Sequence, residues 1–352
     1  MTCSSSTRVR RVSLVCTAAL PLCLFLSACG GGGGGGGGSH VASIPPPPQT
    51  PTPTPTPTDY NAPLRRIADY DLLGRFLNAP GENKPSSSGM TAGKFGLSVS
   101  KPSASAGFAY ELNGPAGFLP GGLTSVEYGG GSNPLQTDPG DARRGSYYRT
   151  LPYSEDLNVD TAFNFDLGYS YVSMGEWEWW YVHLDGGTAG GFGQAFFVAG
   201  DRTPASGIPV SGTATYDAHT LASLASNLTA GIPFTLTADF GAQTIATRID
   251  QDYRYQPNGD SLDYPAPGIH VAGSAPFSNN GTFDIPLTGT ANYSGAYPLN
   301  TLETPPTQPV TGDMNGAFFG PHAEQVGGTL ALDRADGSLL LQDAFVGQQH
   351  PH

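Results

Sequence analysis

The sequence predicts an all-β protein whose C-terminal half is an eight-stranded antiparallel up-and-down β-barrel, preceded by a small irregular β region. Between residues 168 and 347 about ten short segments alternate apolar and polar residues, as strands with one buried face do. The turn signals Gly241-Ala242, Asn280-Gly281 and Asp336-Gly337 separate several of these segments. Three of the segments follow one another closely near the C-terminus, which is typical of the closing part of an antiparallel barrel or sandwich.

Composition and charge exclude several classes of function. The chain has 352 residues, 16 basic and 29 acidic, and a formal net charge of −13. An acidic protein is a poor partner for nucleic acid, and we expect no nucleic-acid binding. The four cysteines are Cys3, Cys16, Cys23 and Cys29, so the later part of the chain can hold neither a disulfide nor a cysteine nucleophile.

Residues 1–28 have the pattern of a lipoprotein signal peptide. A basic start is followed by a mostly apolar run from Leu14 to Leu26, too short for an ordinary membrane span. The tetrapeptide Leu26-Ser-Ala-Cys29 resembles the bacterial lipobox. The resemblance implies lipidation of the Cys29 thiol, cleavage before it, acylation of the new amine and transport to the outer membrane. Two or three acyl chains anchor a protein stably.

Residues 29–60 are predicted to be a tether. Nine glycines, Gly30 to Gly38, favour flexible coil, and the proline run and Pro-Thr repeat through Thr58 favour stiff polyproline II. The stiff part would span roughly 40 Å at ~3.1 Å per residue. A neutral spacer is the simpler alternative to a tether that lifts a domain off the membrane.

Residues 61–166 are expected to form the small β region. Residues 64–78 show a ragged apolar face that one short helix could use. The strand candidates that follow are Lys94–Val99, Phe108–Leu112, Leu123–Tyr128, Tyr147–Leu151 and Thr161–Asp166.

Residues 167–348 are expected to form the barrel, and their first strong strand pattern starts after Gly168. On it, Tyr171, Trp177, Trp179 and Tyr181 share one face, and Glu176 and Glu178 share the other. Cleanly alternating segments follow, namely Val210–Asp217, Phe234–Phe240, Thr244–Asp250, Ile269–Ala275 and Phe283–Leu287. A membrane-spanning barrel also alternates, but it needs no tether, and such barrels usually end on an aromatic residue rather than on His352.

The stretch from Gly312 to Gly347 is the most informative. Met314–Phe319 is predicted to be a strand that Gly320-Pro321 ends, and Ala323-Glu324-Gln325 is predicted to form one helical turn. Gly327-Gly328 opens the next strand, and paired glycines there predict a crossing where backbones approach closely. Leu339–Gly347 is the returning strand.

The same stretch resembles the closing signature of the transferrin-binding protein B family, bacterial surface lipoproteins with eight-stranded barrels. The matching residues are Gly316, Phe318, Phe319, Gly320, Pro321, Ala323, Glu324, Gly327, Gly328 and Thr329, followed by Ala344, Phe345 and Gly347. His322 and Gln325 depart from the family pattern. With two further pieces, the resemblance covers about half of the chain.

This resemblance implies a non-enzymatic, outer-membrane, surface-exposed binding protein without a cofactor. In the family a "handle" subdomain precedes each barrel, which residues 61–166 would supply. The implied partner is a protein of the iron- or haem-carrier type, and a dedicated lipoprotein translocator would deliver the chain to the surface. The alternative is a calyx that binds haem or an iron chelate inside the barrel. A filled interior would favour protein capture, and a void would favour the calyx.

The remaining residues of interest give weaker signals. Glu176 and Glu178 could do acid–base work, but a solvated strand face is the preferred interpretation. No histidine pair has metal-binding spacing, and neither a nucleophile elbow nor a phosphate loop occurs, so we expect neither a metal nor a catalytic residue. Trp177, Trp179, Trp180 and Tyr181 are candidate binding residues, with core packing inside the barrel as the preferred alternative for the alternating face.

Overall fold

The computed structural model shows an all-β protein, as the sequence predicts. It describes residues 62–66, 68–79, 90–92, 95–101, 108–115, 118–129, 136–138, 141–184, 188–221, 231–252, 268–292 and 306–350. These residues form eighteen strands and three short 3₁₀ turns: η2 (Pro63–Arg65), η4 (Pro120–Gly122) and η5 (Ala205–Gly207). The expected signal peptide, Cys29 and the tether lie outside them. No helix within the described ranges is long and apolar enough to cross a membrane.

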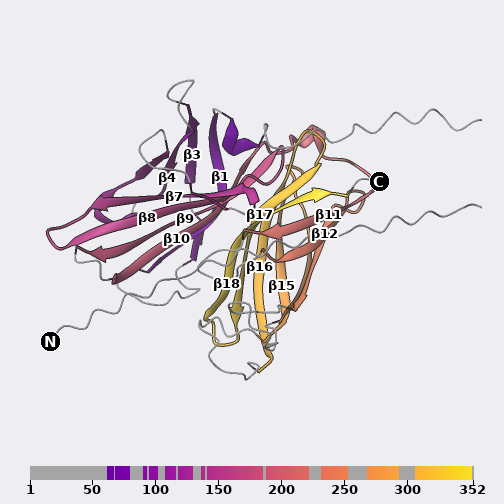
Figure 1. The fold of residues 1–352 in the computed structure, drawn as a ribbon. Coiled ribbons are helices and arrows are strands. Elements are labelled where there is room, and N and C mark those ends of the chain that lie inside the picture. The colour runs from indigo at the N-terminus through magenta and orange to yellow at the C-terminus, as the bar shows by residue number, and fades with distance from the viewer. Residues whose placement is uncertain are drawn as a thin grey trace, which may run out of the picture. The chain divides into compact units, whose positions relative to one another are not determined.

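Ten of the strands form one antiparallel sheet, which we call the handle sheet (indigo to magenta in Figure 1). Its strands are β1 (Ala68–Ala79), β2 (Met90–Ala92), β3 (Phe95–Ser100), β4 (Ala109–Asn113), β5 (Ser125–Gly129), β6 (Gln136–Asp138), β7 (Asp141–Pro152), β8 (Leu157–Asp166), β9 (Val172–His183) and β10 (Thr188–Gly200). The order across the sheet is β5-β4-β3-β1-β10-β9-β8-β7-β6, and β2 pairs with β1. The chain thus returns from β10 to pair with β1, which joins the two ends of this region.

The other eight strands close into an antiparallel up-and-down barrel, which confirms the predicted fold class. They are β11 (Thr213–Thr220), β12 (Pro233–Asp239), β13 (Thr244–Asp252), β14 (Gly268–Pro276), β15 (Thr282–Ala291), β16 (Gln308–Phe319), β17 (Gln325–Arg334) and β18 (Leu339–Gln349). β18 pairs with β11 to complete the ring (Figure 1). The barrel therefore has no free sheet edge.

Large apolar side chains fill the inside of the barrel. The ring of Phe318 lies 5.2 to 6.0 Å from four other rings, those of Tyr216, Phe240, Phe277 and Phe283. Farther along, Phe234 and Phe345 pack edge to face at 5.6 Å. Alternation along β12 and β15 puts their apolar residues into this core and leaves their polar residues exposed.

A second core lies within the handle sheet, because β3–β5 pack over β7–β9. The rings of Tyr110 and Phe163 meet at 5.5 Å, and the indole Nε1 of Trp177 donates a hydrogen bond to the Tyr128 hydroxyl at 2.9 Å. Trp177 and Trp179 are 0% and 1% exposed. These tryptophans are core residues, as preferred, but of the handle sheet rather than of the barrel.

The outer face of the barrel packs on the other face of the handle sheet. Val172 and Met174 of β9 and Phe196 and Val198 of β10 share one apolar cluster with barrel residues, namely Ala317, Phe319, Ala344 and Val346. Backbone bonds reinforce this contact, including Thr203 N to Phe318 O and Gly320 N to Asp201 O, both at 2.9 Å.

Three expectations about the chain's organisation are corrected. The barrel begins at Thr213 rather than at residue 167, because β9 and β10 pair with β8 and β1 in the handle sheet. Most of residues 64–78 form strand β1 rather than a helix, since η2 ends at Arg65. Ala323-Glu324-Gln325 does not form a helical turn: Ala323, at φ +64°, ends the turn that starts at Gly320, and Gln325 already begins strand β17.

Of the two closing glycines, Gly328 lies where backbones are crowded, as predicted, whereas side chains limit the space at Gly327. A Cβ on Gly328 would lie 1.9 Å from the carbonyl oxygen of Asn315, and one on Gly327 would lie 2.8 Å from Cγ2 of Val172. Phe318 points into the barrel, whereas Phe319 packs between barrel and handle sheet. The two glycines therefore have different roles. Gly328 allows the close pairing of β16 with β17, and Gly327 allows the barrel to pack closely on the handle sheet.

Candidate functional site

A row of aromatic side chains runs along one face of β9 from the handle core to the surface. The ring of Trp177 lies 4.9 Å from that of Phe118 in the core. Trp179 and Tyr181 meet edge to face at 5.4 Å, and Tyr181 lies 5.0 Å from the ring of Tyr153. Because side chains two residues apart share a strand face, β9 alone sets the spacing of this row.

The row ends in an exposed apolar surface, which we call the aromatic tip and define as Tyr153, Tyr181 and Leu184. Tyr153 is 42% exposed and Leu184 is 61% exposed, whereas Tyr181 is half-buried. Burial, followed by the hydrogen bond with Tyr153, raises the pKa of Tyr181 to about 12, so the hydroxyl stays neutral. Apolar rings with neutral polar groups suit protein recognition, in which Tyr is enriched.

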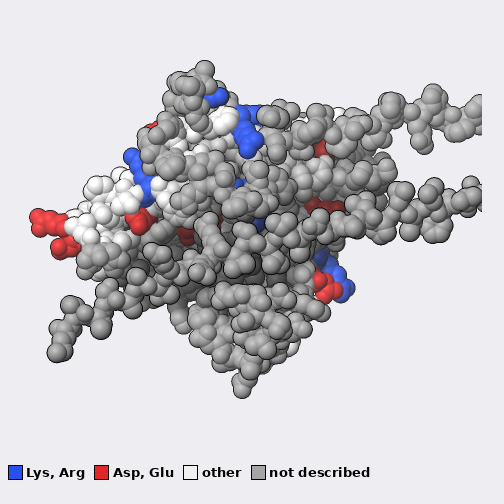
Figure 2. Space-filling model, viewed as in Figure 1, with Lys and Arg blue, Asp and Glu red and all other residues white. Residues whose placement is uncertain are grey.

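The backbone under the tip is fixed by hydrogen bonds of the turn that joins β7 to β8. Leu184 N donates to Asp156 O at 3.2 Å, and Leu157 N donates to the Ser154 hydroxyl at 3.1 Å. Glu155 and Asp156 are exposed in this turn. Figure 2 shows acidic side chains gathered at this left-hand end of the handle sheet. The aromatic tip therefore has an acidic rim and little freedom of its backbone.

The sequence-predicted binding residues are only partly available for binding. Trp177 and Trp179 are enclosed in the handle core, and Trp180 is half-buried on the opposite face of β9. Tyr181 reaches the surface. Tyr153 and Leu184 could not be found from the sequence, because they belong to two different turns, which the bond from Leu184 N to Asp156 O joins in the folded sheet.

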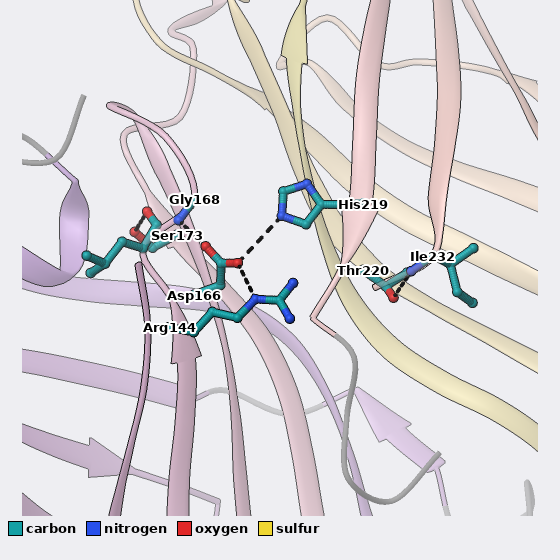
Figure 3. Close-up of polar contacts among 8 residues, drawn as sticks. Arg144, Asp166, Gly168, Ser173, His219, Thr220 and Ile232 are labelled. Carbon is teal, nitrogen blue, oxygen red and sulfur yellow. Dashed lines mark hydrogen bonds and ion pairs between the residues drawn. The ribbon is translucent and has the colours of Figure 1, made fainter. Parts of the chain in front are cut away.

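A buried carboxylate links the handle sheet to the barrel. Asp166 is fully buried at the end of β8, and it accepts hydrogen bonds from Gly168 N at 2.8 Å and from Arg144 Nε at 3.1 Å. His219 Nε2 of β11 lies 3.6 Å from the same carboxylate (Figure 3). A buried charge needs such partners, so we interpret this group as a structural connection.

A second polar connection joins β1 of the handle sheet to β16 of the barrel. Arg75 of β1 forms an ion pair with Asp313 of β16, and its Nη1 donates to Oδ1 at 2.8 Å. Asn315 donates to Asp313 at 2.6 Å and to Asp284 at 2.9 Å. Burial lowers the pKa of Arg75, and the negative charges of Asp284 and Asp333 oppose that shift. Burial raises the pKa of Asp333, and the positive charge of Arg75 opposes it. Like the first group, this one joins sheet and barrel, here through the ion pair of Arg75 with Asp313 rather than through His219 and Asp166.

Glu176 and Glu178 are not a solvated strand face, so that preferred interpretation is wrong. Glu176 is 1% exposed, because this face of β9 turns toward the barrel. Burial, and then the negative charge of Glu176, raises the pKa of Glu178 to about 8. Gln194 Nε2 donates to Glu176 at 2.5 Å, and Asn164 Nδ2 donates to both carboxyl groups at 3.1 and 3.4 Å.

Three of the described histidines, His219, His270 and His350, each lie against a different aspartate. His270 Nδ1 lies 2.5 Å from Asp250, and His350 Nε2 lies 2.8 Å from Asp217. Within the described ranges, no group of three or more His, Cys, Asp or Glu side chains has a metal-binding arrangement.

The comparisons with known proteins give structural neighbours alone. Neither a protein-family model nor a curated protein matches the sequence. The chain is similar to a transferrin-binding protein B variant from Haemophilus parasuis (12% identity, 84% of this chain and 77% of that one, TM-score 0.33). It is also similar to intact Ap-TbpB with both lobes (11%, 81% and 77%, TM-score 0.34) and to the N-lobe of lactoferrin-binding protein B from Moraxella bovis (13%, 58% and 79%, TM-score 0.24). Transferrin-binding protein B is the family that the closing signature of residues 316–347 resembles.

Proposed function

We propose that the chain is a non-enzymatic, lipid-anchored protein of the bacterial cell surface that captures a protein ligand through the aromatic tip. The observation that carries the proposal is the exposed Tyr153, whose ring packs on the ring row of β9 through Tyr181, with Leu184 exposed in the adjoining turn. Hot spots of protein interfaces are aromatic residues held rigidly, with polar groups around them. The tip has all three properties.

The packed barrel interior favours protein capture over the calyx. A calyx binds its ligand in a space enclosed by the strands. Here Phe318 and the four rings around it occupy one part of the interior, and the Phe234–Phe345 pair occupies another. A haem would have to displace these rings, which would cost roughly several kcal/mol for each aromatic side chain removed from its packing.

Localisation and ligand class rest on sequence features. The lipobox resemblance at Cys29 and the tether of residues 29–60 support an anchored domain held away from the outer membrane, delivered by a lipoprotein translocator. The family resemblance supports an iron or haem carrier as ligand. The structural neighbours are named for binding transferrin and lactoferrin, so these two proteins are the first ligands to test.

The test compares two surface variants of the lipid-anchored, full-length protein. The first variant combines Tyr153→Ser with Leu184→Ser and so removes the exposed apolar side chains of the tip. The control, Val210→Ser, removes an apolar side chain that lies away from the tip and is 88% exposed. Binding of labelled transferrin, lactoferrin and a haem carrier to cells carrying each variant would be measured. We expect at least a tenfold loss for the tip variant and no change for the control. Equal binding by both variants would refute the tip as the capture surface.

A further inference from the structure

Exposed apolar side chains from three turns meet at the end of the handle sheet that carries the aromatic tip. Gly121 of η4 approaches the tip so closely that a Cβ there would lie 3.2 Å from Cε2 of Tyr153. Leu123, which directly follows η4, is 39% exposed. Leu123, Tyr153 and Leu184 are three of the five large apolar side chains that are exposed within the described ranges. Such a concentration of exposed apolar groups marks an interaction surface.

The charged side chains of the same turns are acidic. Glu155 and Asp156 are exposed, and neither forms an ion pair with another described residue. The turns contain neither Lys nor Arg over residues 118–123, 151–157 and 181–184, and His183 is their one basic side chain. With two acids and a neutral His183, the formal charge of this end is −2. Figure 2 shows these acidic side chains at the extreme left of the molecule.

The arginine that precedes the tip on β7 does not balance this charge. Arg149 lies four residues before Tyr153, roughly 13 Å along an extended strand, which exceeds the screening length of about 8 Å at physiological ionic strength. Its Nη1 donates to the carbonyl oxygen of Glu127 at 2.7 Å. The exposed Glu127 is paired directly with the exposed Glu111 of β4, so this neighbouring area is acidic as well. Like charges placed opposite each other in a sheet repel, and a cationic partner would relieve that repulsion.

We propose that the aromatic tip and its acidic rim bind a basic protein surface, on which Lys or Arg side chains surround an apolar patch. The inference rests on the proposed function and adds the charge of the partner. The apolar side chains supply contact area, and an arginine of the partner can stack on the exposed ring of Tyr153 while it pairs with a carboxylate. A partner with carboxylates at these positions would be repelled by Glu155 and Asp156.

The apolar and acidic parts of the surface should act on different steps of binding. Exposed ion pairs at the rim of an interface contribute little affinity, but opposite charges accelerate encounter and make the association rate depend on salt. Buried apolar contacts at the centre mainly slow dissociation. Removal of the acids should therefore lower the association rate constant, whereas removal of Tyr153 and Leu184 should weaken binding at every salt concentration.

The experiment selects binders of the full-length protein, purified in detergent, from a phage-display library of one small scaffold with a randomised face. Binders that fail to bind the combined variant Tyr153→Ser with Leu184→Ser are classed as dependent on the tip, and all others serve as controls for folding and for the acidity of the whole protein. We expect the tip-dependent binders to carry at least twice as many Lys and Arg residues on the randomised face as the control binders.

Two matched charge variants then test the rim with the tip-dependent binders. Glu155→Gln with Asp156→Asn should lower the association rate constant at least threefold in 50 mM NaCl and should flatten its dependence on salt. Asp69→Asn with Asp71→Asn removes the same charge from exposed positions of β1, which β3 and β4 separate from β5, and should change the rate less than twofold. The control binders should bind every variant equally, because all four acids are exposed.

The outcomes separate this inference from the proposed function. Tip-dependent binders without an excess of Lys and Arg would overturn the inference and leave the tip as a capture surface for a partner of other charge. Equal loss of association rate in the two charge variants would also overturn it, because the effect would then belong to the charge of the whole protein. A selection that yields no tip-dependent binder would overturn the tip as an interaction surface, and the proposed function with it.

Discussion

Gly328→Val tests the crowding at the closing strands of the barrel. The added Cβ would lie 1.9 Å from Asn315 O and 2.7 Å from the Cα of Gly316, whereas real Cβ contacts essentially never fall below 3.0 Å. Both obstacles are backbone atoms, so no side chain can rotate away. β16 and β17 would have to separate by about an ångström, which would weaken ladder hydrogen bonds beside the substitution.

The expected cost follows from overpacking together with backbone displacement. Overpacking alone typically costs about 1–3 kcal/mol, and branched residues add strain where the backbone cannot relax. We expect a loss of roughly 3 kcal/mol, which lowers the Tm of a domain of ~200 residues by roughly 6–12 °C.

The assay is thermal unfolding followed by circular dichroism, with two controls. Gly96 also lies within a strand, but a Cβ there would meet only Cβ of Asn113 at 3.7 Å, so Gly96→Val should change Tm little. Gly34→Val, within the tether, should change nothing. An unchanged Tm for Gly328→Val, or an equal drop for Gly96→Val, would refute the argument that a crowded crossing selects glycine here.

Three further predictions concern anchoring, pH and exposure. Cys29→Ser should abolish incorporation of labelled palmitate, since only the thiol accepts the lipid; continued labelling would contradict the lipobox interpretation. Because Glu178 has a pKa of about 8 when folded and about 4.5 when unfolded, the folded state binds the extra proton between these values, and stability should fall as pH rises from 4.5 to 8. Glu178→Gln should flatten this dependence of Tm on pH, because it removes the titrating carboxyl group; an equally steep curve would contradict the argument. Protease added to intact cells should remove the folded domain, and protection there with cleavage in permeabilised cells would place it in the periplasm.

The sequence predicts the barrel well because many of the barrel strands have one face in the core and the other exposed to solvent. On β12, Phe234, Leu236 and Ala238 point inward and the residues between them outward, and alternation shows this directly. Turn residues such as Asp336-Gly337 then fix the hairpins, and the glycine pair fixes the closing contact.

The handle sheet is harder to predict because several of its strands are covered on both faces. On β1, Tyr70 and Leu72 enter the handle core, whereas Leu73 and Arg75 face the barrel, so the strand loses its alternation and reads as a ragged helix. β9 keeps its alternation, but a periodic pattern does not say which sheet a strand joins. Its pairing with β8 and β10 depends on distant partners, and the boundary at residue 167 was wrong for that reason.

The candidate sites were missed for a related reason. In the sequence Glu176 and Glu178 look like residues of a solvent-exposed strand face, and only the folded structure shows that this face of β9 turns toward the barrel. Tyr153 becomes a binding candidate only when the sheet places it against Tyr181. The chemistry of single residues can be read from the sequence, but the meeting of Tyr153 with Tyr181 and the covering of Glu176 by the barrel cannot.

The contacts between handle sheet and barrel also explain how a binding surface on the sheet can be rigid. The aromatic tip lies at one end of β9, and the other end of the same strand packs against Gly327 through Val172. Between them, β9 carries buried rings on one face and the Glu176–Glu178 group on the other. Both faces of β9 are therefore fixed by packing, so the strand that supports the tip has little freedom to move.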